Sequence, residues 1–249
     1  MRFTLVKELA VTDFKLRYKN SVLGYFWSLL KPLAIFGSLY LVFSVFARFQ
    51  VEHYQLYLLL GIMLWNYFTE ASINGMHALV NKSTLLTKIN VNKATIILAS
   101  NVTTLLTLAL NLVIFFVFVV IFNPTLSWTY LMLPLSIAEI FLVGLGISYI
   151  LGVFYVKLRD LVSIWEIVLQ IGFWVTPIIY PITIVPKRFL PIVLLNPVYR
   201  IISEARGSLI EHVWPSAADL VTTLSIALLI FLVGYLVYTR RAPYVNEDL

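Results

Sequence analysis

The chain has 249 residues, of which 61% are hydrophobic and only 12% are charged. Soluble domains carry about 25% charged residues, so this composition cannot cover a globule of this size with polar surface. Soluble enzymes and nucleic-acid-binding proteins are therefore excluded, and the mean hydropathy of +0.93 indicates that lipid is the main solvent. The sequence predicts an all-α integral membrane protein.

Apolar stretches long enough to cross a bilayer recur along the chain. A helix needs about 20 apolar residues to span the roughly 30 Å hydrocarbon core. Six transmembrane helices are predicted, at about residues 22–47, 56–79, 94–122, 130–156, 161–180 and 217–238. No cleaved signal peptide is expected, because a stretch of mixed charge precedes the first of them.

The positive charges indicate which side of the membrane holds the termini. Six spans place both termini on one side, and 13 of the 18 Lys and Arg residues fall on that side. Cytoplasmic loops carry an excess of Lys and Arg. The sequence therefore predicts a multi-pass protein of the cytoplasmic membrane with both termini in the cytoplasm.

Two further segments have special patterns. Residues 2–20 place apolar side chains on one helical face, namely Phe3, Val6, Ala10 and Phe14. This pattern predicts an amphipathic helix in the cytoplasmic membrane interface, with an ordinary solvated helix as the alternative. Residues 181–215, on the outer side, hold five of the ten prolines and no apolar run long enough to cross. Re-entrant helices are predicted there, and a partly ordered external loop is the alternative.

The sequence lacks the common motifs for binding nucleotides and metal ions. There is no phosphate-binding GxxxxGKS/T loop and no GxGxxG turn, so the chain is not expected to bind or hydrolyse ATP. There is no cysteine, and His53, His77 and His212 lie far apart in sequence, so no metal site and no cofactor are expected.

Three carboxylates fall inside the predicted spans: Glu70, Glu139 and Glu166. Such groups are functional hypotheses by default. Glu166 and Gln170 are spaced i, i+4 and share a helical face, where they can bond to each other or to a neighbouring span. The alternatives are helix–helix adhesion and a position near the membrane boundary.

Aromatic residues are abundant, with 6 Trp, 14 Tyr and 17 Phe. Clusters occur at Tyr25–Trp27, at Trp65 with Tyr67 and Phe68, and at Phe173 with Trp174. Most aromatic side chains are expected to pack or to face lipid. The clusters are alternatively suited to line a path for a sugar polymer, because aromatic faces stack on sugar rings without fixing one register.

Several stretches together resemble a known family. They are RYKNSVLGYFWSLLKPL at 17–33, NKSTLLTK at 81–88, LRDL at 158–161, QIGFWVTPIIYP at 170–181 and LNPVYRIISEAR at 195–206. In this order they resemble the permease subunits of second-type ATP-binding-cassette exporters, in the branch that exports polysaccharides such as O-antigen and teichoic acids. The loop after Lys88 departs from the family, since it reads INVNK where members usually have a Phe-Pro pair.

The resemblance implies a single permease domain over residues 1–249, which forms a homodimer and pairs with two separate ATP-binding subunits. The chain is then not an enzyme, and ATP and Mg belong to the partner subunits. In the family, the cytoplasmic loop between the second and third spans carries a coupling helix that docks on the ATPase, and this coupling loop corresponds to residues 80–93. The residues expected to contact the ATPase are Asn81, Lys82, Leu85, Leu86 and Lys88.

The expected cargo is a lipid-linked polysaccharide (O-antigen, capsule or teichoic acid) that crosses the inner membrane of a bacterium. Cations near its entry are suited to attract an anionic pyrophosphate; their alternative role is to orient the protein and contact anionic lipids. The predicted substrate path comprises Arg17, Lys19, Tyr25, Trp27, Lys31, Trp65, Phe173 and Trp174.

Other functions remain as alternatives. A drug or lipid exporter would use the same architecture. An ion-coupled secondary transporter would use Glu70, Glu139 and Glu166 and no ATPase partner. A membrane-embedded glycosyl- or acyltransferase would need a clustered acid/base or metal constellation, which the sequence does not contain.

Overall fold

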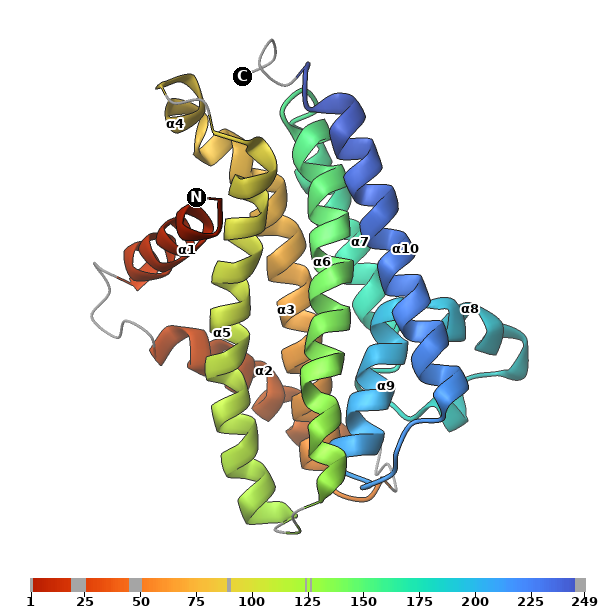
Figure 1. Ribbon diagram of the computed structural model, residues 1–249. Coiled ribbons are helices and arrows are strands. Elements are labelled where there is room, and N and C mark those ends of the chain that lie inside the picture. Colours follow the sequence, from red (N-terminus) through yellow and green to blue (C-terminus); the bar gives the residue numbers. More distant parts are fainter. Residues whose placement is uncertain are drawn as a thin grey trace.

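The computed structural model describes residues 2–18, 26–44, 51–88, 91–123, 125 and 127–244. Every regular element among these residues is a helix, as the sequence predicts (Figure 1). In chain order the helices are α1 Arg2–Tyr18, α2 Phe26–Val42, α3 Tyr54–Asn81, α4 Ser83–Lys88, α5 Lys93–Phe122, η2 Trp128–Met132, α6 Leu133–Tyr155, α7 Leu161–Val175, η3 Ile182–Ile184, η4 Lys187–Phe189, α8 Leu190–Leu195, α9 Pro197–Leu209 and α10 Ala217–Arg241.

Four long helices form the bundle: α3, α5, α6 with the preceding η2, and α10. Within the described residues, these are the helices long and apolar enough to cross a membrane. They coincide with the predicted spans at 56–79, 94–122, 130–156 and 217–238. Helix α3, with 28 residues, is about 42 Å long, which exceeds the thickness of the hydrocarbon core.

The other two predicted spans correspond to shorter helices. Helix α2 has 17 residues and α7 has 15, lengths of about 25 Å and 23 Å. Helix α7 ends at Val175 because Pro177 favours the extended conformation of Thr176, whose ψ is 130°. Residues 22–25 and 45–47 of the predicted first span lie outside the described residues. Crossing at 22–47 and at 161–180 therefore stays a prediction.

Small residues bring the long helices together. A Cβ atom on Gly234 of α10 would lie 2.1 Å from the carbonyl oxygen of Gly146 on α6. Where α3, α5 and α6 meet, Asn101 donates a hydrogen bond to Ser148 (Nδ2 to Oγ, 3.0 Å), and Ser148 covers Gly75. Close backbone contacts and buried polar pairs of this kind stabilise helix packing in membranes.

The predicted N-terminal helix corresponds to α1, which lies across α5 (Figure 1). Val6 and Ala10, on its predicted apolar face, are buried. The Thr103 hydroxyl of α5 donates to the Ala10 carbonyl oxygen over 3.2 Å. Part of the apolar face therefore packs on α5, and a position of α1 in the membrane interface stays a prediction.

After α7 the chain folds back through η3, η4 and α8 into α9. Helices α8 and α9 have 6 and 13 residues, too short to cross a membrane. Figure 1 shows the segment around α8 projecting sideways from the bundle, level with the lower half of α10. Helix α9 packs against α6, α3 and α10. A re-entrant position of these helices stays a prediction.

Candidate functional site

A cavity of about 350 Å³ lies between α2, α3 and α7. It unites three residues of the predicted substrate path, Trp65, Phe173 and Trp174. We call it the aromatic groove, and its lining is Ile35, Trp65, Asn66, Thr69, Ile73, Glu166, Leu169, Gln170, Phe173 and Trp174.

The aromatic rings of the groove contact one another across the α3–α7 packing. The ring centroids of Trp65 and Phe173 are 6.1 Å apart, and those of Phe173 and Trp174 are 5.6 Å apart. This approach depends on Gly172, because a Cβ there would lie 2.9 Å from the Trp65 indole. Trp65 is almost fully buried, whereas Trp174 is 54% exposed. The groove therefore has a fixed aromatic wall and an open aromatic edge.

Polar groups share the groove with these rings. Glu166 and Gln170 are exposed and line the same cavity, so they share a face as their spacing predicts. Asn66 and Thr69 face them from α3, and the Thr69 hydroxyl is buried with no hydrogen-bond partner among the described residues. Hydrogen-bond donors and acceptors beside aromatic faces suit a ligand whose rings have apolar faces and carry hydroxyl groups at their edges.

Two other predicted path residues, both described, lie outside the groove. Trp27 and Lys31 are exposed on α2 and are not among the residues that line it. Arg17 lies in α1, but its side chain is outside the described residues, as are Lys19 and Tyr25 altogether. The three predicted carboxylates also do not gather, and the described residues contain no group of three His, Asp or Glu that could hold a metal ion.

The predicted coupling loop, residues 80–93, contacts α1 at the C-terminal end of α3. Its segment 83–88 is the short helix α4. The Lys82 ammonium lies 2.5 Å from an Asp13 carboxylate oxygen of α1, in an ion pair whose side chains are 29% and 26% exposed. Leu85 and Leu86 pack on a cluster of buried residues, whereas Asn81 is exposed. The side chain of Lys88 lies outside the described residues.

Arg206 of α9 is a residue that sequence reasoning missed. It is only 3% exposed, and its guanidinium donates to the carbonyl oxygens of Tyr57 (2.9 Å), Pro177 (2.9 Å) and Ile178 (2.7 Å). It therefore joins α9 to α3 and to the chain that leaves α7. The sequence does contain a sign of this role. Arg206 lies on the apolar face of α9 with Ile202 and Leu209, and a buried cation needs hydrogen-bond partners.

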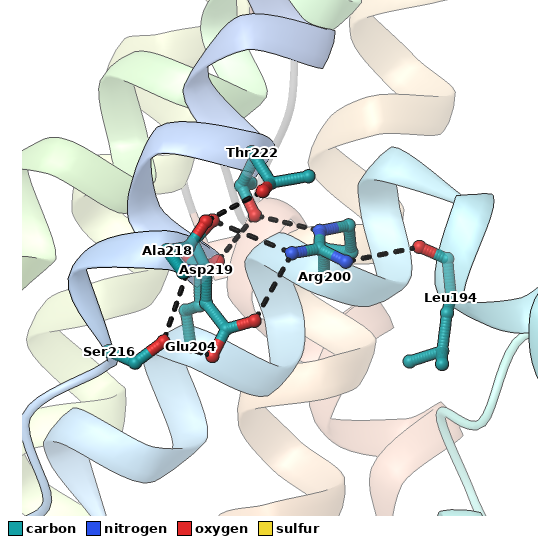
Figure 2. A network of polar contacts seen from close by, with 8 residues as sticks. Leu194, Arg200, Glu204, Ser216, Ala218, Asp219 and Thr222 are labelled. Carbon is teal, nitrogen blue, oxygen red and sulfur yellow. Dashed lines mark hydrogen bonds and ion pairs between the residues drawn. The ribbon is translucent and has the colours of Figure 1, made fainter.

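A second cation of α9, Arg200, joins α9 to α10 (Figure 2). Its Nε donates to the Thr223 hydroxyl over 2.9 Å, and its Nη2 lies 3.4 Å from an Asp219 carboxylate oxygen. Thr223 in turn donates to Glu204. Burial raises the pKa of Glu204 above its ordinary value. Glu139 of α6 is fully buried, does not line the groove, and is close enough to Glu204 and Arg200 to interact with them electrostatically.

Comparison with known proteins places these features in a family. Residues 4–210 match the ABC-2 type transporter family. The chain is 29% identical to an O-antigen export system permease protein RfbA of Klebsiella pneumoniae over 207 residues, 82% of this chain and 79% of the relative. It is 23% identical to the protein of the same name from Myxococcus xanthus over 247 residues, 98% and 95% of the two chains. The chain therefore belongs to the ABC-2 type transporter family.

Proposed function

We propose that this chain is the membrane-spanning permease subunit of an ATP-driven exporter of a lipid-linked polysaccharide. The observation that supports it most is its similarity to O-antigen export permeases, which in one relative extends over 98% of this chain. The aromatic groove agrees with that cargo, because it combines Trp and Phe rings with carboxylate and amide groups. O-antigen is the favoured polymer, and capsule or teichoic acid is the alternative.

The energy comes from other chains in this proposal. Because the sequence has no phosphate-binding loop, two separate ATP-binding subunits, which carry ATP and Mg, dock on a homodimer of this permease. Each copy crosses the bacterial cytoplasmic membrane six times with both termini in the cytoplasm. Two copies together would enclose a continuous path for a polymer, whereas the interior of one bundle is packed with its own side chains.

Helix α3 is the element suited to transmit motion. Its C-terminal end adjoins α4 and the Lys82–Asp13 ion pair, where the ATP-binding subunit is proposed to dock. Its middle carries Trp65 of the aromatic groove, and its first turns hold Tyr57, which contacts Arg206. A displacement of α4 on ATP binding would therefore be carried along one continuous helix past the groove to the outer segment.

Copurification tests this proposal. The chain is purified with the candidate ATP-binding proteins encoded beside its gene, and ATP hydrolysis is measured in lipid nanodiscs. We expect one ATP-binding protein to copurify in equal numbers and its activity to change with a lipid-linked glycan, but not with small hydrophobic drugs. Stimulation by drugs alone would instead favour a drug exporter. Transport driven by a proton or sodium gradient without an ATPase would favour a secondary transporter.

A further inference from the structure

A second cavity, of about 570 Å³, lies where α7 ends and the chain folds back. Its walls come from the last turn of α7 (Trp174 and Val175), from Tyr180, from the η3–η4 segment (Ile184 and Phe189) and from α8 (Ile192). Trp174 also lines the aromatic groove, so the two cavities adjoin. We call this second cavity the hairpin cavity.

Several polar groups in these walls already form hydrogen bonds within the protein. The Tyr180 hydroxyl is within hydrogen-bond distance of the carbonyl oxygens of Trp174 (2.9 Å) and Val175 (3.1 Å). The backbone N–H groups of Val185 and Phe189 donate to carbonyl oxygens within their own turns. A sugar or a peptide would therefore lose hydrogen bonds to water on entering, whereas a hydrocarbon chain would lose none.

Two cations stand at the rim of this apolar cavity. Lys187 and Arg188 lie between the lining residues Pro186 and Phe189, and both are exposed. The Arg188 guanidinium is held 4.6 Å from the centre of the Phe189 ring. Among the described residues neither cation has an ion-pair partner. Ammonium and guanidinium groups both donate charge-assisted hydrogen bonds to phosphate.

We propose that the hairpin cavity binds an acyl chain of an anionic bilayer phospholipid, with the phosphate on Lys187 and Arg188. The cavity adjoins an apolar surface of the chain that is open for an acyl chain to enter, since Trp174 is 54% and Ile192 is 61% exposed. The segment also projects sideways from the bundle (Figure 1). The site goes beyond the proposed function, because it requires only that the chain lie in a membrane.

Quenching of Trp174 fluorescence tests this site directly. The full-length protein is reconstituted in vesicles that contain phosphatidylglycerol or phosphatidylcholine with brominated acyl chains, and bromine quenches a nearby indole. The contribution of Trp174 is the difference between the wild-type protein and Trp174→Phe. We expect phosphatidylglycerol to quench Trp174 at a mole fraction at least fivefold lower than phosphatidylcholine, since each cation near a membrane surface contributes about fivefold in affinity.

Variants test the cations and the apolar cavity of the site separately. The double variant Lys187→Ala/Arg188→Ala should abolish the preference for phosphatidylglycerol. The matched double variant Arg240→Ala/Arg241→Ala, at the C-terminal end of α10, should preserve it. Ile192→Phe, which fills the cavity, should lower quenching by both lipids. Ile167→Phe, on an α7 residue that is 57% exposed and does not line the cavity, should not.

Three results would overturn the proposal. The first is equal quenching of Trp174 by the two lipids. The second is a preference that survives the loss of both Lys187 and Arg188. The third is recovery of Trp174 fluorescence on adding a polyprenyl phosphate at mole fractions where unbrominated phosphatidylglycerol has no effect, which would make a prenyl carrier the occupant.

Discussion

The guanidinium carbon of Arg206 lies 3.4 Å from the centre of the Tyr57 ring, while two of its nitrogens donate to the Tyr57 carbonyl oxygen. One cation therefore holds both the ring and the backbone of the same α3 residue. Because it also binds the carbonyl oxygens of Pro177 and Ile178, it fixes the exit of α7 against α3.

Replacing this cation should destabilise the protein strongly. Arg206→Met removes the donors to three buried carbonyl oxygens, at an expected cost of about 3 kcal/mol. Arg206→Lys should recover only part of the stability, because an ammonium lacks the planar fork that reaches several carbonyl oxygens. Thermal unfolding in detergent measures the loss. Arg240→Met, at an exposed position, is the control, and a melting temperature of Arg206→Met equal to that control would contradict this role.

The Asp13–Lys82 ion pair should matter for coupling more than for stability. A partly exposed ion pair contributes less than about 1 kcal/mol to folding, so Asp13→Asn and Lys82→Met should leave thermal unfolding nearly unchanged. If α1 and α4 move together with the ATP-binding subunit, both variants should lower ATP-dependent export. The measurement is surface glycan per amount of permease in the membrane.

A charge reversal controls for this pair. Asp13→Lys combined with Lys82→Asp restores the attraction with the opposite polarity and should recover part of the export that either reversal alone removes. Lys15→Met, on an exposed cation of the same helix, should have no effect. Equal export by the single and the combined reversals would show that the ion pair has no part in coupling.

The contact between Gly146 and Gly234 should tolerate no side chain. Gly234→Ala would place its Cβ within 2.8 Å of backbone atoms of Gly146, which cannot rotate away, so α6 and α10 must separate. The expected cost is about 2 kcal/mol, observed as a lower melting temperature. Gly37→Ala on α2 is the control, because nothing lies within 4 Å of its added Cβ. A stable Gly234→Ala protein would mean that the two helices are not packed this closely.

The sequence predicts the long helices well and the short ones poorly, for a physical reason. Helices α5, α6 and α10 arise from predominantly apolar runs that hydrophobicity alone identifies. The apolar run at 161–180 looks long enough to cross, but Pro177 ends α7 early at Val175. Apolar length measures a preference for lipid, whereas the end of a helix depends on backbone conformation at single residues.

The candidate site is likewise predictable from the sequence only in part. The Glu166–Gln170 face follows from helical spacing, which is local. The contact of Trp65 with Phe173 depends on how α3 packs on α7, and no pattern within either segment determines that packing. Glu139 is an intermediate case. Its burial follows from its place in an apolar span, but its proximity to Glu204 depends on α9, which folds back from a distant part of the chain.

The aromatic groove gives the last prediction, which tests whether its rings serve transport or only packing. Trp65→Phe keeps an aromatic face beside Phe173, whereas Trp65→Ala removes it and leaves a cavity, so both export and stability should fall with alanine. Trp174→Ala separates the two roles. Because Trp174 is 54% exposed, its loss should change stability by less than about 1 kcal/mol yet lower export severalfold if sugar rings stack on it. Trp128→Ala, at an 81% exposed residue outside the groove, is the matched control. Normal export by a stable Trp174→Ala protein would restrict the groove to a structural role.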